Sequence, residues 1–197
     1  MNRTLTTLSL ALLLGTGTFA ASNSENTIKQ AFDALQNDIS QHGIFHPAVA
    51  KDYESISKGY LAQNKLDEAT DYALKALKVE MKLLSSNDPE LAKRYFETGN
   101  LYYKHKAYPT ALLYMEKAAA IYAVADKESL PLADTYEAIA SIYVSLGDPQ
   151  KALAFNDKAR KIRKAKLPAG DAALKRSEEN AKFLEGEIEK EKKAAKR

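Results

Sequence analysis

The chain has 197 residues, of which 28% are charged and 45% hydrophobic, and this is the balance of an ordinary folded domain or a short repeat array. Its formal net charge of +3 is too small to indicate nucleic acid as a partner. It contains no cysteine, so we expect neither disulfide bonds nor a lipid on an N-terminal cysteine.

The first 22 residues have the layout of a secretory signal peptide. Arg3 supplies one positive charge, residues 5–19 carry none, and small residues follow at 20–22. We predict cleavage after Ala20, because Thr18 then stands three positions before the cut. An uncleaved anchor is the alternative, but the apolar run is shorter than the ~20 residues that span a bilayer. We therefore expect a signal peptide over 1–20 and a periplasmic or secreted protein.

An amphipathic helix is predicted over 24–42. Its Ala31 and Ala34 lie one period before Ala73 and Ala76, so the segment resembles the second half of a repeat that lacks its first half. We interpret it as an N-terminal flanking helix.

Six sites then recur three times, at steps of 42 and 41 residues. Each set has a tyrosine, an apolar site, a small residue and a second tyrosine on a first helix, and two alanines on a second helix. The sets are Tyr53, Ile56, Ser57, Tyr60, Ala69 and Ala76; Tyr95, Thr98, Gly99, Tyr102, Ala111 and Ala118; and Tyr136, Ile139, Ala140, Tyr143, Ala152 and Ala159. Such a period indicates stacked helix pairs. A plain helical bundle is the alternative, but bundles demand no fixed period.

Prolines and capping residues mark where the helices of these repeats begin. Pro47, Pro89 and Pro131 suit a first helical turn, and Asp88 is a good N-cap. We predict helices over 48–63, 66–84, 89–105, 108–126, 131–146 and 149–166, and repeats over 46–87, 88–129 and 130–167, within a repeat region of 46–167.

A charged helix follows over about 171–193, in a C-terminal segment assigned to 171–194. Its apolar residues form one thin stripe of Leu174, Ala181, Leu184 and Ile188. One apolar stripe on an otherwise polar helix is expected of a cap on a repeat stack.

These repeats resemble the tetratricopeptide repeat (TPR), in the longer variant found in kinesin light chains and many bacterial adaptor proteins. The resemblance implies an all-α, right-handed superhelical solenoid of about three TPR helix pairs with flanking helices. It also implies a scaffold for protein–protein or protein–peptide interaction without catalysis. The long variant usually carries an Asn-Asn pair that binds a peptide backbone. This chain has Glu54-Ser55, Phe96-Glu97 and Glu137-Ala138 there, so a peptide clamp of that design is in doubt.

The family's first helices face the concave side of the solenoid, which implies the partner-binding positions of this chain. We expect the second repeat to be the main binding region, because it presents Phe96 and Tyr103 as an exposed aromatic pair beside an amide and two lysines. The lysines and carboxylates are expected to form a bipolar groove. Packing of both rings against neighbouring repeats is the alternative. The implied positions are Lys51, Glu54, Lys58, Lys93, Phe96, Asn100, Tyr103, Lys104, Asp134, Glu137 and Ser141, with Leu61 and Val144 beside them.

The sequence contains no motif in which catalytic or metal-binding residues occur at the required spacing. His42 and His46 are four apart, but Gly43 and Pro47 place them across a helix break, so surface or capping histidines are favoured over a metal site. No phosphate-binding loop or nucleophile elbow occurs. We expect no cofactor, no metal and no enzyme activity.

A basic stretch over 158–166 supports a second hypothesis. A solvated helix face is the simpler interpretation. The alternative is an envelope-associated structural protein that docks this helix on an acidic partner or an anionic membrane surface, with self-association through its repeats left open. Nucleic acid is disfavoured, because export is predicted and the net charge is small. The sequence leaves the oligomeric state open.

Overall fold

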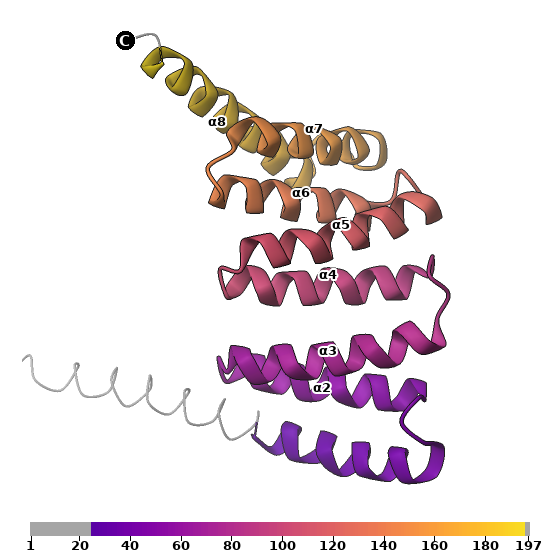
Figure 1. Cartoon of the computed structure of the whole chain (residues 1–197). Coiled ribbons are helices and arrows are strands. Elements are labelled where there is room, and N and C mark those ends of the chain that lie inside the picture. The colour runs from indigo at the N-terminus through magenta and orange to yellow at the C-terminus, as the bar shows by residue number, and fades with distance from the viewer. Residues whose placement is uncertain (1–24, 196–197) are drawn as a thin grey trace, which may run out of the picture. The chain divides into compact units, whose positions relative to one another are not determined.

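The computed structural model describes residues 25–195, and all regular secondary structure in this part of the chain is α-helical (Figure 1). Residues 25–42 form the first described helix. The helices after it are α2 (Pro47–Ala62), α3 (Leu66–Leu83), α4 (Pro89–Lys104), α5 (Tyr108–Ala125), α6 (Leu130–Ser145), α7 (Pro149–Lys166) and α8 (Ala172–Ala194). The helix limits predicted for the repeats and for 171–193 agree with these bounds to within one residue. The predicted signal peptide lies outside the described residues.

The described residues form two compact units, 25–83 and 84–195. The first unit holds the helix at 25–42 with the hairpin of α2 and α3. The second holds the hairpins α4–α5 and α6–α7, followed by α8 against α7. Each unit is described by itself below.

The turn inside each helix hairpin has the same backbone geometry. Asn64, Lys106 and Gly147 occupy equivalent positions with φ of 58°, 58° and 75°. The amide of the next residue then bonds to a carbonyl five residues back, as in Lys65 N to Tyr60 O at 2.9 Å. This is a Schellman ending, which favours glycine at the residue with positive φ. The predicted breaks are therefore confirmed as tight helix–helix turns.

Side-chain caps fix where most of the helices begin. Asp88 accepts a hydrogen bond from Glu90 N at 2.9 Å, as predicted for an N-cap. Ser129 caps α6, Asp148 caps α7 and Asp171 caps α8 in the same manner. His46 caps α2 through its Nδ1 atom, which accepts from Ala48 N at 3.3 Å.

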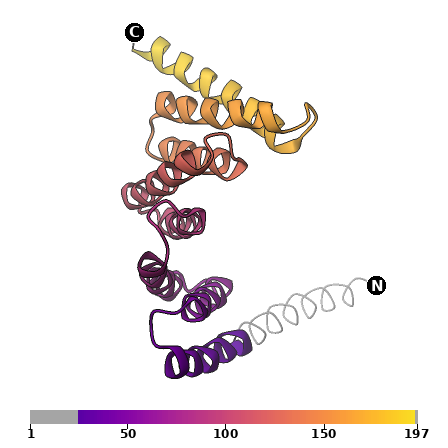
Figure 2. The same cartoon turned by 90° about the vertical axis from the view of Figure 1, so that its right-hand side faces the viewer.

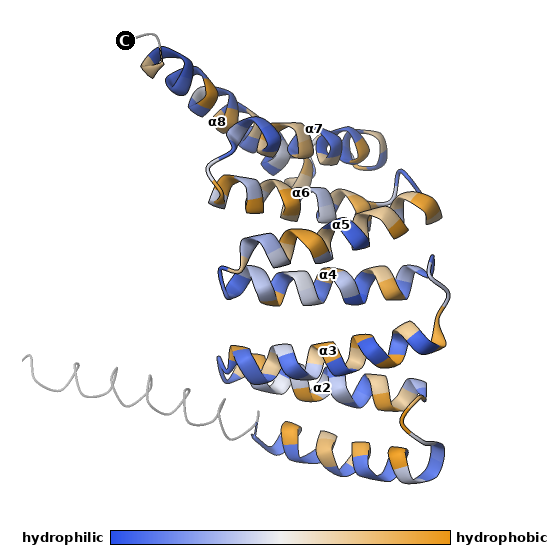
Figure 3. Ribbon diagram, in the orientation of Figure 1, coloured by the Kyte–Doolittle hydropathy of each residue, from blue (hydrophilic) through white to orange (hydrophobic). Residues whose placement is uncertain are grey.

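The core of the first unit joins the helix at 25–42 to α2 and α3. Ala31 and Leu35 pack with Val49, Ile56 and Val79, all buried. The hydropathy colouring shows the apolar residues of the first helix repeating at helical intervals between hydrophilic ones (Figure 3). Ala34 is exposed, whereas Ala76 is fully buried, so the predicted match between these two alanines is wrong. Leu35 takes the buried position instead, because the helix presents the 28–31–35 stripe to its neighbours.

The small residues of the repeats lie at the helix crossings, as predicted. The six alanines of the second helices, including Ala69 and Ala159, are each 0% exposed. At the small first-helix site, the Ser57 hydroxyl donates to Ala69 O at 2.6 Å. Side chains of this size allow two helix backbones to approach closely.

Each repeat also holds an aromatic triad that repeat spacing alone did not single out. The two first-helix tyrosines flank one ring from the second helix, and the second tyrosine stacks on it at an interplanar angle of 9° to 19°. A lysine three residues after the central ring lies over it or over its neighbour. The central rings are Tyr72, Tyr114 and Phe155, and the lysines are Lys75, Lys117 and Lys158.

The α8 helix is a cap on the second unit. Its buried residues are Leu174, Ser177, Ala181 and Leu184, which confirms three positions of the predicted stripe and adds a serine. The rest of α8 is predominantly hydrophilic (Figure 3). In Figure 2 the chain turns after α7, and α8 runs back beside it. This return places one face of α8 close to α6.

Candidate binding groove

A cavity of about 250 Å³ opens in the second unit between α6 and α8. The end of α4 contributes to its lining, and α7 contributes one residue. Its lining residues are Tyr103, Glu137, Ala140, Ser141, Val144, Ser145, Asn156, Asn180, Phe183 and Leu184. We call this cavity the groove. It brings together Tyr103, Glu137 and Ser141, three of the residues that the sequence predicted for partner binding.

Two exposed apolar side chains face this groove from opposite helices. Val144 of α6 is 48% exposed and Phe183 of α8 is 60% exposed. Both line the cavity. Large apolar side chains gathered around a hollow are typical of surfaces that bind another molecule.

Tyr103 forms one end of the groove and is held in place. Its ring packs against Tyr108 at a centroid distance of 5.6 Å, and its hydroxyl lies 3.3 Å from Ser145 Oγ. Tyr103 and Phe96 are both half-buried, so the predicted exposed aromatic pair is wrong. Exposed aromatic surface comes from Phe183 instead, because α8 packs its stripe of small and aliphatic residues inward and leaves this ring outside.

Asn156 of α7 lies at the groove with an unsatisfied oxygen. The residue is 1% exposed, and its Nδ2 atom donates to Ser177 O at 2.8 Å. Among the described residues its Oδ1 atom has no hydrogen-bond partner. A buried acceptor without a donor costs about 1–3 kcal/mol. The groove wall therefore holds a buried acceptor without a donor among the described residues.

Arg163 neutralises the carboxylates beside the groove. Its side chain is 1% exposed, and it donates to Glu137 Oε2 at 2.5 Å and to Asp134 Oδ1 at 2.6 Å. Arg176 of α8 donates to the other Glu137 oxygen at 2.8 Å. Burial acts to raise the pKa of Glu137, but the hydrogen bonds from Arg176 and Arg163 outweigh it, and the pKa lies below its usual value. The glutamate is therefore ionised and paired at neutral pH.

These ion pairs correct two predictions. Arg163 was grouped with the solvated basic stretch 158–166, but it is buried between α6 and α8. Asp134 and Glu137 were expected to form the acidic side of a bipolar groove, but both are paired with arginine. The sequence could not show this, because the arginines come from α7 and α8 and the carboxylates from α6.

The remaining predicted positions on α4 lie outside the groove. Lys93 is exposed and 3.5 Å from Glu90, and Lys104 is exposed at the end of the helix. Asn100 is half-buried. These side chains do not join the lining of the cavity.

The predicted positions on α2 belong to the first unit. Lys51 is exposed, and the Lys58 ammonium group pairs with Glu54 one turn earlier. Pairing along one helix leaves little net charge on this part of α2.

Two important groove residues, Asn156 and Phe183, were missed from the sequence. Asn156 occupies the position of Ala73 and Met115 in the other repeats, both of them buried. An amide at a core position of a repeat was the available signal. The sequence gave no comparable signal for Phe183, because the packing of α8 on the second unit decides which of its faces is buried.

No group of three or more histidine or acidic side chains in residues 25–195 could hold a metal ion. None of the helices in this range is long and apolar enough to cross a bilayer. His42 and His46 lie on either side of a helix break, as predicted, with rings stacked at 4.3 Å.

Comparison with known proteins bears on the fold. A family model described as tetratricopeptide repeat matches residues 132–171, which include nearly all of α6 and all of α7. A search of the curated proteins finds no match to the chain.

Solved structures of similar fold come from kinesin-light-chain-like proteins. One is a crystal structure of nearly identical TPR-like repeats from a Podosopora anserina kinesin light chain, with a TM-score of 0.66, 16% identity, and coverage of 89% of this chain and 92% of that one. A single-substitution variant of that protein has the same score and identity and 91% coverage of its own chain. BtubC (BKLC) from P. vanneervenii has a TM-score of 0.65, 16% identity, and coverage of 85% and 82%. Together with the three repeats and the match of residues 132–171 to the tetratricopeptide-repeat model, these structures show that the chain has an all-α solenoid fold similar to kinesin-light-chain TPR-like repeats.

Proposed function

We propose that the chain is an exported scaffold that binds a protein partner by holding an extended segment of it in the groove between α6 and α8. TPR repeats generally mediate protein–protein interactions, and their fold is typically a non-catalytic scaffold. The main support for the proposal is that three residues line the same cavity. Phe183 and Val144 are exposed, and Asn156 is buried with an Oδ1 atom that has no donor among the described residues. In this proposal the first helices form the concave, partner-facing side, and α8 adds a second wall.

The groove suits a neutral or weakly charged segment with an apolar side chain. Phe183, Val144 and Tyr103 offer apolar surface, and burial of such surface gives about 25 cal/mol per Å². Two arginines face two carboxylates at its edge, so little net charge is left to attract an ion. We therefore expect binding to depend weakly on salt.

The amide oxygen of Asn156 would select for a donor in the bound segment. Because this atom is buried, a backbone N–H of an extended peptide would reach it once the side chains that cover it move aside. The bond would remove the cost of an unpaired buried acceptor. Asn156 would thus fix the orientation of the bound segment, whereas Phe183 and Val144 would provide the apolar contact.

Selection from a random peptide library tests this proposal. Peptides enriched on the purified chain should bind about tenfold more weakly to Phe183→Ser, because the exposed ring is their anchor. Leu113→Ser is the matched control, since Leu113 is a 51% exposed aliphatic residue on α5 that does not line the groove. A library without enriched peptides, or equal losses in the two variants, would contradict binding in the groove.

Export is the second part of the proposal and has its own test. It rests on the charge and size pattern of residues 1–22. Intact mass of the protein recovered from the periplasm or the medium should correspond to a chain that begins at Ala21. Full-length chain in the cytoplasm would contradict export without bearing on the groove.

A further inference from the structure

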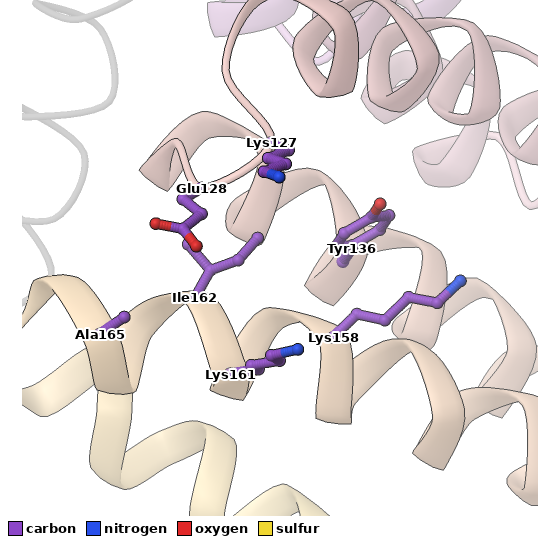
Figure 4. A pocket seen from close by; sticks show the side chains of 7 residues that line it. All are labelled: Lys127, Glu128, Tyr136, Lys158, Lys161, Ile162 and Ala165. Carbon is purple, nitrogen blue, oxygen red and sulfur yellow. The ribbon is translucent and has the colours of Figure 1, made fainter.

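A second hollow of about 340 Å³ lies in the same unit, between the α5–α6 loop and α7. Lys127 and Glu128 of the loop line one side, and Lys158, Lys161 and Ile162 of α7 line the other (Figure 4). Tyr136 of α6 completes the wall (Figure 4). No residue of this hollow lines the groove, so the two sites are separate. We call it the lysine hollow.

The charge of the lysine hollow is unbalanced. Three lysines and a single glutamate line it. Within residues 25–195 none of the three ammonium groups lies within ion-pair distance of a carboxylate, whereas Arg160 on the same helix is paired with Asp157 at 2.8 Å. Cations that converge on a concave wall raise the local concentration of an anionic ligand.

One of these lysines is fixed in place by aromatic rings. Lys158 Nζ lies 4.4 Å from the centroid of Phe155 and 5.4 Å from that of Tyr136. Of these two rings, Tyr136 lines the hollow, so its contact places the ammonium group beside the wall. Ile162 is 7% exposed, and with Tyr136 it gives the hollow an apolar part.

We propose that the lysine hollow binds an acidic segment of a protein partner that also carries apolar side chains. A carboxylate of the segment would lie among Lys127, Lys158 and Lys161, and a neighbouring apolar side chain would pack on Tyr136 and Ile162. The site is independent of the groove and does not rest on the function proposed above.

The shape of the hollow favours a peptide over a membrane surface. A planar layer of headgroups reaches lysines on a rim, but it does not reach the recessed surface of Ile162. The hollow also lacks arginine, whose planar fork suits the bidentate recognition of phosphate. Lysines act as point charges on flexible stems, which suits carboxylates presented at variable spacing.

The other repeats supply a matched control. Lys117 is the counterpart of Lys158, and it lies 5.3 Å from the Tyr95 centroid and 5.8 Å from that of Tyr114. One repeat earlier in the chain, Ala120 is the counterpart of Lys161 and Ser85 is the counterpart of Lys127. Replacing Lys117 therefore removes one charge and one aromatic contact without altering the lysine hollow.

The test uses the purified chain and a fluorescent peptide that alternates glutamate with leucine. We expect saturable binding by fluorescence anisotropy that weakens with added salt and is absent for a glutamine–leucine peptide. The double variant Lys127→Gln/Lys161→Gln should weaken binding at least about fivefold, and Lys117→Gln less than about twofold. Phe183→Ser should leave binding unchanged. All of the substitutions are at exposed side chains, and thermal unfolding by circular dichroism checks that each variant folds.

Three results would overturn the proposal. The first is no saturable binding of the acidic peptide, and the second is an equal loss in Lys117→Gln, which would indicate attraction by net charge only. The third comes from sedimentation with phosphatidylglycerol vesicles. If vesicles bind and respond to the lysine variants while the peptide does not bind, the hollow serves a membrane surface and the peptide assignment is wrong.

Discussion

Arg163 and Glu137 form a buried ion pair that ties α7 to α6, with 2.5 Å between Nη2 and Oε2. The same guanidinium donates from Nη1 to Ser177 Oγ of α8 at 2.6 Å. One side chain therefore connects α6, α7 and α8, three of the helices that line the groove. The position of Phe183 depends on this connection, because α8 carries that ring.

Loss of the buried guanidinium should destabilise the second unit. In Arg163→Gln, Glu137 keeps only its partly exposed partner Arg176, and Ser177 loses its donor. We expect the free energy of unfolding, from urea denaturation, to fall by about 3 kcal/mol. Arg160→Gln, one turn earlier and paired only with Asp157 on the surface, should change it by less than about 0.5 kcal/mol. Equal effects would mean that Arg163 is not a buried structural cation.

Acid should weaken the same region through Glu137. Its pKa in the folded chain lies below the usual 4.5, so its ionised form stabilises the fold at pH values above 4.5. This contribution is lost as the pH falls below 4.5 through the lowered folded-state pKa. Urea midpoints of wild type and Glu137→Gln should therefore differ clearly at about pH 7, and the difference should shrink as the pH falls below 4.5. A constant difference across this range would contradict the role of Glu137.

Gly59 should not tolerate a methyl group. A Cβ atom built there would overlap Cγ1 of Ile28 on the first described helix. Gly59→Ala should therefore lower stability by about 1–3 kcal/mol, although alanine is the better helix former. Adding Ile28→Ala should relieve the overlap, so that the double variant loses less than the sum of the two single losses. Additive losses would show that the two residues are not in contact.

Gly99 offers a contrast in α4, at the small first-helix site that Ser57 occupies in the first repeat. Its added Cβ would meet the flexible Met115 side chain at 3.1 Å. Alanine there should be nearly neutral, whereas Gly99→Leu should cost several kcal/mol by overpacking. An unchanged melting temperature for the leucine variant would contradict the packing of this repeat.

The hairpin turn at Lys106 should be improved by glycine. Lys106 has φ of 58°, where an L side chain costs about 1 kcal/mol, and glycine already stands at the equivalent Gly147. We expect Lys106→Gly to raise the unfolding free energy by about 0.5–1 kcal/mol. Asn64→Gly should change it less, since asparagine tolerates this conformation. A destabilised Lys106→Gly chain would exclude the left-handed conformation at that turn.

Much of the fold was predictable because it rests on local and periodic signals. The spacing of Tyr53, Tyr95 and Tyr136, the prolines and the turn residues set the helix limits to within one residue. Six recurring sites gave the helix crossings, where alanines are fully buried. Periodicity failed at the N-terminal helix, where Ala34 is exposed, because that helix packs on one hairpin through a different stripe.

The groove was less predictable, because it depends on contacts between residues far apart in the sequence. Repeat positions predicted that Tyr103, Glu137 and Ser141 face a partner, and all three line the groove. They gave no sign that Arg163 and Arg176 would neutralise Glu137, since these residues lie 26 and 39 positions away from it. Asn156 was visible as a polar residue at a core position, but its unpaired oxygen depends on the packing of α8.

In-cell photocrosslinking at Phe183 tests most directly whether the groove holds a partner. A photoreactive benzoyl-phenylalanine is placed at Phe183 and, as a control, at Leu113, and adducts are identified by mass spectrometry. The proposed scaffold function predicts one or a few discrete protein adducts at Phe183 that are lost when Val144→Ser is added, and none of these at Leu113. No discrete adduct at Phe183, or the same adducts at both positions, would contradict a partner segment bound between α6 and α8.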